Sequence, residues 1–375
     1  MSDSFRPRVG FVLERSLGHV THAENLIRLL PQQDDIEAVL LPVDFAVEGW
    51  AAHLPVYNSN WTVRAGWRAA RAIRRAQTRA PLDALFIHTQ VPAVLSQRWM
   101  RRIPTVVSLD ATPMQYDELG QHYGHSLGHP RIERLKYDLN RACLQRAARL
   151  VTWSDWAKHG LVDGYGVRSD QVVVIPPGAT QSLWANRVPR VEDGGPVRVL
   201  FVGGDLRRKG GDLLIDASTR LRAELGSNAV ELHLVTRSRV EPSEGVHVHC
   251  GLGPNSPELI LLYHRSHIFC LPTRGDSHAI VLSEAGATGL PAVVTAIAGI
   301  PEVVRDGETG LVVPVDDVGA LTIALRRLVD DPHLRQRLGE AARRRIAADF
   351  DAEKNVRKIV DVVTGIARQR TAPAT

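Results

Sequence analysis

The sequence predicts an α/β fold of two doubly wound domains, in which helices cover both faces of parallel sheets. Short β-branched runs alternate with longer helical patterns along the whole chain, which is typical of repeated βαβ units. The length of 375 residues corresponds to about two domains, at ~100–200 residues each. Pro/Gly-rich stretches at residues 176–178 and 194–196 interrupt the alternation, which then begins again.

The individual elements follow from these runs in chain order. In the first half, we expect strands at residues 9–13, 38–42, 84–88, 105–109, 150–153 and 172–175. In the second half, we expect strands at residues 197–202, 230–235, 246–249, 268–271, 292–294 and 310–313. Helices fill the gaps, and two long Arg-rich helices, 320–347 and 352–368, end the chain.

The domain organisation follows from the restart of the pattern near residue 190. We expect an N-terminal domain at residues 1–190, a second domain at 191–350 and a C-terminal helix at 351–375 that packs back on the first domain. In two doubly wound domains, a ligand binds in the cleft at the carboxyl ends of the strands.

Composition excludes several classes of protein. Hydrophobic residues make up 44% and charged residues 23% of the chain, which excludes a disordered chain, a collagen and a disulfide scaffold. Cys143, Cys250 and Cys270 lack the C-x-x-C spacing of a zinc or redox site. No apolar stretch reaches the ~18 residues needed to cross a bilayer. We therefore expect a cytoplasmic protein with reduced thiols.

The net charge of +5 comes from the first half of the chain. Residues 1–190 hold 23 basic against 17 acidic side chains. The segment Trp61–Arg79 carries six arginines, no acid and the aromatic Trp67. It predicts either peripheral contact with the inner face of a membrane, which would suit a lipid-linked acceptor, or a solvated face of an Arg-biased protein. No nucleic-acid motif accompanies the charge, so we expect no nucleic-acid partner.

The first segment that suggests a ligand-binding site lies between an expected strand and an expected helix. Its sequence is FVGGDLRRKGG, at residues 201–211. Its glycines let a ligand approach the backbone, and its cations suit a diphosphate. Lys209 stands out because the chain has only five lysines against 41 arginines. The alternative interpretation is an exposed basic turn. The absence of G-x-G-x-x-G argues against a plain NAD site.

The second segment covers residues 271–291. Asp276 lies in the loop after an expected strand, and Glu284 lies in the helix that this loop opens. Free N–H groups at a helix N-terminus can receive phosphate oxygens, and an ionised carboxylate can accept from both hydroxyls of a ribose. The alternative interpretation is a surface acid and a capping acid.

Together the two segments resemble the retaining glycosyltransferases of the GT-B fold, family 4. The resemblance extends through AGIPEVV at 298–304 and DGETGL at 306–311 and covers residues 197–350; the first half is similar only loosely. It implies two Rossmann-like domains facing across a cleft. Asp276 and Glu284 match the family's E-x7-E signature in spacing, with Asp276 in place of the first glutamate.

The resemblance implies roles for residues of the second half. Glu284 would hold the donor ribose, Asp276 would meet a hydroxyl of the donor sugar, and Lys209 would bind the diphosphate. Gly204 stands where many members carry an arginine, so Arg208 is expected to supply the second cation. Arg237 falls where the family shapes its base pocket. The backbone N–H groups expected at the diphosphate are those of Ser277, His278, Ala279 and Ile280.

The resemblance also implies roles for three residues of the first half. Gly18 matches a glycine loop that faces the donor phosphates, and His19 would point toward donor or acceptor, although a lone histidine is more often structural. Asp110 stands where relatives often have a histidine that touches the transferred sugar. The expected catalytic residues are therefore Asp110, His19, Lys209 and Asp276.

These residues predict an enzyme that needs no metal and no cofactor. Because neither of the two segments contains a D-x-D motif, cations and helix dipoles would neutralise the leaving diphosphate. The resemblance implies transfer of a hexosyl unit from a nucleoside diphosphate sugar, with retention, to the hydroxyl of a saccharide, a lipid-linked glycan or a small metabolite. Two alternatives stay open: a nucleotide-sugar epimerase of the same fold, and a non-catalytic nucleotide-sugar-binding protein.

Overall fold

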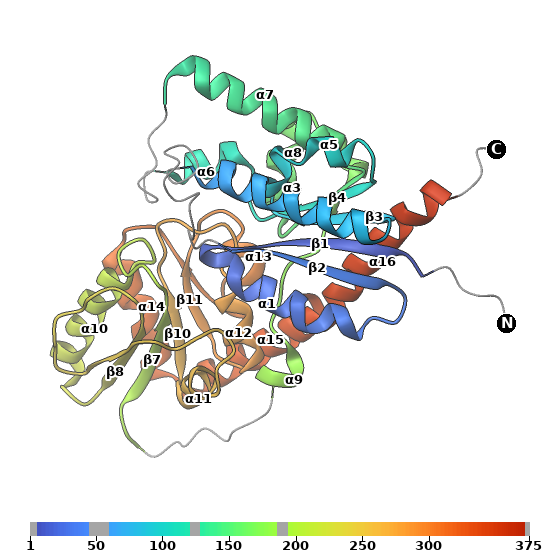
Figure 1. The fold of residues 1–375 in the computed structure, drawn as a ribbon. Coiled ribbons are helices and arrows are strands. Elements are labelled where there is room, and N and C mark those ends of the chain that lie inside the picture. Colours follow the sequence, from blue (N-terminus) through green and yellow to red (C-terminus); the bar gives the residue numbers. More distant parts are fainter. Residues whose placement is uncertain (1–5, 45–59, 121–127, 186–193, 372–375) are drawn as a thin grey trace. The chain divides into compact units, whose positions relative to one another are not determined.

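The structure is a computed structural model that describes residues 6–44, 60–120, 128–185 and 194–371 (Figure 1). By its internal contacts the chain divides into two units. The first consists of residues up to 118, residues 128–176 and the C-terminal segment from Glu353. The second consists of residues 177–352, together with Leu119 and Gly120. The domain boundary expected at residues 190 and 191 lies outside the described residues.

Each unit contains a six-stranded sheet, and every strand pair is parallel. The first sheet has the order β2-β1-β3-β4-β5-β6 and the second the order β12-β11-β10-β7-β8-β9. The first-sheet strands are β1 (Arg8–Arg15), β2 (Glu37–Asp44), β3 (Ala84–His88), β4 (Thr105–Leu109), β5 (Arg149–Thr152) and β6 (Val172–Val174). The second-sheet strands are β7 (Val197–Val202), β8 (Val230–Val235), β9 (Val246–His249), β10 (Ile268–Leu271), β11 (Ala292–Thr295) and β12 (Gly310–Val313). All twelve expected strands are confirmed.

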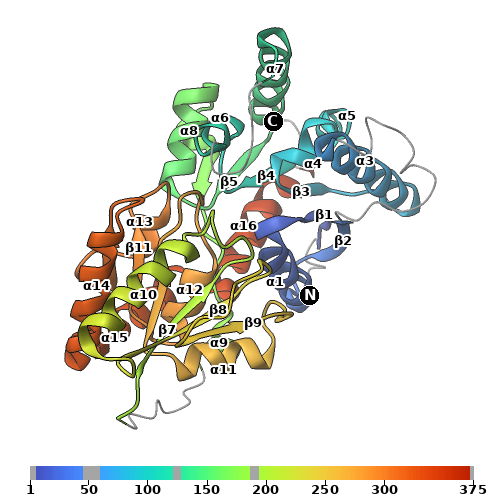
Figure 2. The ribbon, with the colours of Figure 1, turned by 90° about the vertical axis from the view of Figure 1, so that its left-hand side faces the viewer.

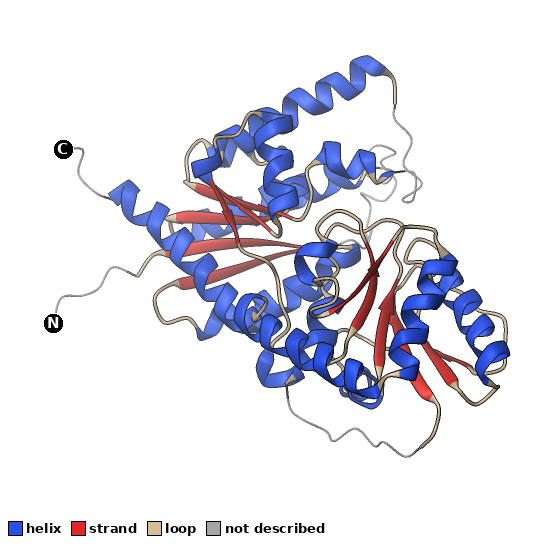
Figure 3. Cartoon of the chain, turned by 180° about the vertical axis from the view of Figure 1, so that it is seen from behind, coloured by secondary structure: helices blue, strands red, loops and turns tan. Residues whose placement is uncertain are grey.

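Helices lie on both faces of each sheet (Figure 3). In the first unit they are α1 (Val20–Leu29), α3 (Trp61–Arg79), α4 (Gln90–Val94), α5 (Gln97–Met100), α6 (Pro113–Glu118), α7 (Pro130–Arg146), α8 (Asp155–Tyr165) and α16 (Ala352–Thr371). In the second unit they are α9 (Gln181–Trp184), α10 (Gly211–Leu225), α11 (Pro257–Arg265), α12 (Val281–Ala287), α13 (Ile300–Val303), α14 (Val318–Asp330) and α15 (Pro332–Asp349). Helix α10 packs against α14 (Figure 2), and α12 packs against α15.

The single helix expected at residues 320–347 is wrong, because the chain forms two helices there. Asp331 ends α14 and begins α15: its Oδ1 accepts a hydrogen bond from the backbone N–H of Leu334 at 2.9 Å. Pro332 follows at the first position of α15. A proline has no N–H to continue a helix but fits its first turn, so the break falls at these two residues.

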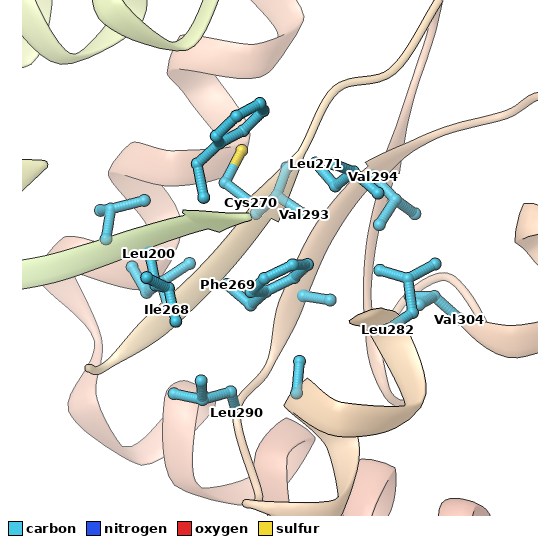
Figure 4. Packing of buried hydrophobic residues seen from close by; sticks show 14 of the residues in the cluster. Leu200, Ile268, Phe269, Cys270, Leu271, Leu282, Leu290, Val293, Val294 and Val304 are labelled. Atoms are coloured by element: carbon cyan, nitrogen blue, oxygen red, sulfur yellow. The ribbon is translucent and has the colours of Figure 1, made fainter. Parts of the chain in front are cut away.

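The core of the second unit is a layer of apolar side chains around β10, the strand beside β7 (Figure 4). The side chains of β10 are buried on both faces, as expected for an inner strand of a parallel sheet. Phe269 is fully buried and stacks on Tyr263 with ring centroids 5.5 Å apart. Burying one such side chain contributes about 1.5–3 kcal/mol. This layer fixes the ends of β7 and β10, where the site loops begin.

Some of the basic and aromatic side chains of α3 pack against the first unit instead of facing solvent. The side chain of Arg64 is buried and lies over the ring of Trp61. The indole N–H of Trp61 donates to Glu14 Oε1 at 2.7 Å. Trp67 is exposed. Four arginines are also exposed, namely Arg71, Arg74, Arg75 and Arg79. Among the described residues, no helix combines the length and apolar character needed to span a membrane.

Candidate functional site

The two loops of the second unit that contain predicted site residues follow β7 and β10, which are neighbours in the sheet. The strand order reverses between them: β8 and β9 continue on the side of β7, and β11 and β12 continue on the side of β10. Ligands of doubly wound sheets bind at such a switch point, at the carboxyl ends of the strands. The two segments that the sequence singled out therefore meet at the place where this fold binds ligands.

Gly210 lets the two loops approach each other closely. Its φ is +76°, and a Cβ built on it would lie 1.9 Å from the carbonyl oxygen of Pro272. A side chain would therefore collide with backbone in a conformation that already favours glycine. Arg274 strengthens the junction: its N–H donates to the carbonyl of Arg208 at 2.9 Å, and its Nη1 donates to Asp212 Oδ1 at 2.7 Å.

Lys209 and Asp276 form an ion pair across these loops. Their side chains are only 15% and 11% exposed, so Lys209 does not belong to an exposed basic turn, although Asp205 and Arg207 of the same segment are exposed. Burial lowers the pKa of Lys209, and the charge of Asp276 opposes that shift. The structure thus brings two predicted site residues together and gives the buried ammonium a counter-charge.

Arg208 is held beside this pair. Its Nη1 donates to the carbonyl of Gly275 at 2.7 Å, and its backbone N–H donates to Asp205 Oδ1 at 3.0 Å. Its Nε lies 3.8 Å from Asp205 Oδ2. The guanidinium is therefore oriented toward the loop that contains Asp276.

The turn at Gly204 is occupied by a second arginine. A Cβ built on Gly204 would lie 2.8–3.2 Å from atoms of the Arg237 guanidinium, and the Arg237 N–H donates to the Gly204 carbonyl at 3.3 Å. Gly204 is the position where the resemblance expects an arginine. The structure brings the cation of Arg237, which follows β8, to that place instead, a contact between distant residues that sequence spacing does not reveal.

Residues 277–280 form a buried turn before α12. Ser277, His278, Ala279 and Ile280 are each less than 10% exposed. Ala279 has a φ of +54°, an uncommon conformation for a residue with a side chain. The carbonyl of Ser277 accepts from the N–H of Gly299 at 2.9 Å, and the His278 ring lies 5.9 Å from that of Phe350. The tight turn is held in place by packing around it.

Glu284 lies in the first turn of α12 and is 3% exposed. Burial raises its pKa to about 7, and the hydroxyl of Tyr263, which donates to Glu284 Oε2 at 2.9 Å, opposes this shift. The interpretation of Glu284 as a surface or capping acid is wrong. Tyr263 is a residue that sequence reasoning missed, because its partner lies on a different helix and no motif contains it.

In the first unit, the structure brings together two of the three predicted residues. His19 Nε2 lies 3.8 Å from Asp110 Oδ1, and both side chains are largely buried. His19 also packs edge-on against His88 and Trp153. Gly18 is exposed, and a Cβ built on it would meet nothing within 4 Å, so no contact within its unit requires a glycine there.

Sequence reasoning also missed the polar cluster at the end of β1. Glu14 is 2% exposed and accepts hydrogen bonds from Ser16, Trp61 and Thr89. His88 is fully buried nearby, and burial together with His22 and His19 lowers its pKa well below the usual value. A carboxylate at the end of an otherwise apolar strand was the one available signal.

Comparison with known proteins assigns the family. Residues 18–181 match Glycosyltransferase Family 4, and residues 184–345 match Glycosyl transferases group 1. A glycogen synthase of Mycobacterium tuberculosis is 29% identical over 259 residues, which cover 66% of this chain and 60% of that protein. The match therefore spans less than two thirds of that relative.

Solved structures show the same fold. Sucrose-phosphate synthase from Thermosynechococcus elongatus aligns over 97% of this chain and 100% of its own, with a TM-score of 0.75 and 16% identity. Anabaena HepE in complex with UDP and glucose aligns over 96% of this chain and 100% of its own, with a TM-score of 0.66 and 14% identity. The sequence matches give the family, and the matching structures give the fold. The chain therefore belongs to the family 4 glycosyltransferases of the GT-B fold.

Proposed function

We propose that the protein transfers a hexosyl unit, with retention of configuration, from a nucleoside diphosphate sugar to a hydroxyl acceptor. The observation that carries this proposal is the buried ion pair of Lys209 and Asp276 at the switch point of the second sheet. The names of the relatives support a hexosyl donor, since one is a glycogen synthase and another was solved with UDP and glucose.

The cations of the second unit are proposed to bind the diphosphate. Arg208 and Lys209 lie in the loop after β7 and contact the loop after β10, and Arg237, which follows β8, contacts the first loop at Gly204. A largely buried ammonium acts on phosphate oxygens with less screening than an exposed one. Stabilising the charge that develops on the leaving diphosphate is the way such a site accelerates transfer without a metal.

Glu284 is proposed to bind the ribose. Tyr263 holds one carboxylate oxygen, Oε2, which orients the group so that Oε1 can accept from ribose hydroxyls. Because burial raises the pKa of Glu284 to about 7, donor hydroxyls that hydrogen-bond to the carboxylate would favour its ionised form. The buried carboxylate is costly by itself and gains its missing hydrogen bonds from the donor.

Asp276 is proposed to act on the donor sugar as well as on Lys209. Its Oδ2 is engaged by the ammonium, and we assign a sugar hydroxyl to its other oxygen. In the first unit, His19 and Asp110 form the second polar pair, and we assign them to the transferred sugar or the acceptor. We propose front-face attack, in which the leaving phosphate takes the acceptor proton and the new glycosidic bond forms on the face that the phosphate leaves.

The exposed part of α3 is the proposed membrane contact. Trp67 and the four exposed arginines are the side chains available for an anionic surface and an interfacial aromatic anchor. The three cysteines are free, which supports a cytoplasmic setting.

Co-sedimentation with anionic vesicles tests the proposed membrane contact of α3. Trp67→Ala should reduce binding to the vesicles, and equal binding by wild type and variant would refute the contact.

The transfer reaction is tested with the purified full chain. UDP-, GDP- and ADP-hexoses are incubated with a panel of hydroxyl acceptors, with and without EDTA, and the anomeric configuration of any product is read by NMR. We expect a product that retains the anomeric configuration of the donor and that still forms in the presence of EDTA. Lys209→Met should lower the transfer rate at least ~100-fold, which is typical for the loss of one charge-stabilising group.

The control is Lys136→Met, because Lys136 also pairs with a carboxylate but lies on α7 with a half-exposed side chain. Full activity is expected for this variant. An inverted product, or an epimerised donor formed without any acceptor, would contradict the proposal.

A further inference from the structure

Three histidines and one glutamate gather on one face of β8 and β9, at the edge of the second sheet. Parallel pairing sets His233 opposite His247 and Val235 opposite His249. Glu231 lies two residues before His233 on β8, on the same face of the strand. The rings of His247 and His249 stack against that of His233, with centroids 4.9 Å and 5.3 Å away. The role proposed above uses none of these four side chains.

The ligand atoms of this cluster have the spacing that one metal ion needs. His233 Nε2 lies 3.7 Å from Glu231 Oε2, and His247 Nε2 lies 4.0 Å from Glu231 Oε1. One ligand atom from each of the three residues lies within 4.8 Å of the other two. Zinc binds nitrogen and oxygen ligands at ~2.0–2.2 Å, so two ligands of one ion lie at most about 4.4 Å apart. Small side-chain rotations would bring all three onto one ion.

The hydrogen bonding of His233 fits a metal ligand. Its Nδ1 lies 3.1 Å from His249 Nε2, a distance at which one of the two rings donates a hydrogen bond to the other. Its Nε2 is buried and has no hydrogen-bond partner among the described residues, although it faces the Glu231 carboxylate. A ligating imidazole typically donates its other N–H to a neighbouring group, which orients the ring. His249 is placed to receive that N–H.

The surrounding charges leave room for a cation. Arg198 pairs with this carboxylate through Nε, 3.9 Å from Glu231 Oε2, while Oε1 of the same carboxylate faces His247. The side chain of His247 is 50% exposed, which gives an ion access from solvent.

We propose that Glu231, His233 and His247 bind one divalent transition-metal ion, with zinc the best match to this ligand set, and that His249 orients His233. The ion would join the edge strand β9 to β8 through side chains as well as backbone. Strand β8 continues into Thr236 and Arg237, and the Thr236 N–H donates to the carbonyl of His249. The site is structural in character and does not depend on the proposed transfer reaction.

Metal titration of the untagged full chain, after treatment with a chelator, tests the proposal. Calorimetry with Zn²⁺ should give one ion per chain, Co²⁺ should produce the visible absorption of a four-coordinate nitrogen/oxygen site, and Mg²⁺ should not bind. Zinc should also raise the Tm, since a ligand that binds the folded state stabilises it. Absence of stoichiometric zinc binding would overturn the proposal.

Three variants give graded expectations. His247→Ala should abolish one-to-one binding, and Glu231→Gln should do so independently, which covers the case in which one variant folds poorly. His249→Phe should weaken binding about 10–100-fold, the usual loss for a residue that orients a ligand. His333→Ala, which removes an exposed histidine at the start of α15, is the control and should bind as wild type. Wild-type affinity in His247→Ala, or an equal loss in His333→Ala, would overturn the proposal.

Discussion

The ammonium of Lys209 and the carboxylate of Asp276 form an ion pair that joins the turn after β7 to the loop after β10. The two residues lie 67 positions apart in the chain. Both side chains are largely removed from water, where a lone charge of either sign would be costly. The pair therefore preorganises a cation at the switch point of the sheet before any donor arrives.

Removing both partners of this pair should cost less than the sum of the two single removals. Lys209→Met and Asp276→Asn should each lower the free energy of unfolding by about 2–4 kcal/mol, because each leaves a buried group without its counter-charge. The double variant should lose less than the sum of the two single losses. Urea unfolding of the four proteins measures this coupling, and strict additivity would show that the pair is not formed.

Glu284→Gln should stabilise the protein at high pH only. The pKa of Glu284 is raised to about 7 in the folded chain, from an ordinary value of 4.5, so its stabilising contribution is complete below pH 4.5 and is lost as the pH rises through 7. The wild type should lose about 3 kcal/mol relative to the variant between these limits. Denaturant unfolding at pH 4.5 and pH 8.5 checks this, and a pH-independent difference would contradict it.

Tyr263→Phe should make that pH dependence steeper. The Tyr263 hydroxyl donates to Glu284 and opposes the rise of its pKa, so without the hydroxyl the pKa should rise further. Hydrogen bonds to charged groups contribute about 1.5–3 kcal/mol, so the loss should be larger at pH 8.5 than at pH 4.5. The matched control is Tyr137→Phe on α7, whose hydroxyl donates to a backbone carbonyl; its effect should not change with pH.

Gly210→Ala should lower the free energy of unfolding by more than about 3 kcal/mol. The alanine would have to adopt a left-handed backbone conformation, and its Cβ would collide with backbone. The added Cβ would lie 1.9 Å from the carbonyl oxygen of Pro272. Gly253→Ala is the control in the same unit, because nothing lies within 4 Å of its Cβ position. Thermal unfolding of both variants checks this prediction. An unchanged Tm in Gly210→Ala would show that the two loops do not approach as described.

The strands could be predicted from the sequence because their signal is local. Each is a short apolar run of the type that a buried parallel strand needs, and all twelve are present. The break at Asp331 and Pro332 also had a local signal, a capping aspartate before a proline, which the expectation of one helix at 320–347 overlooked.

The site could be predicted only in part. Motif spacing pointed to Lys209, Asp276 and Glu284, but not to the pairing of the first two or to the burial of the third. Tyr263, Glu14 and the approach of Arg237 to Gly204 depend on contacts between elements far apart in the chain. Such contacts follow from the packing of whole elements, which single-sequence patterns do not encode.

The assignment of the donor site to the second unit is tested by isothermal titration of the chain with UDP, GDP and ADP, compared between wild type, Lys209→Met and Lys136→Met. We expect wild type and Lys136→Met to bind one of the three nucleotides with equal affinity. Lys209→Met should bind it at least ~10-fold more weakly, since hydrogen bonds to charged groups contribute about 1.5–3 kcal/mol. Equal affinity in all three proteins, or no binding of any nucleotide by the wild type, would contradict the assignment of the second unit as the donor site.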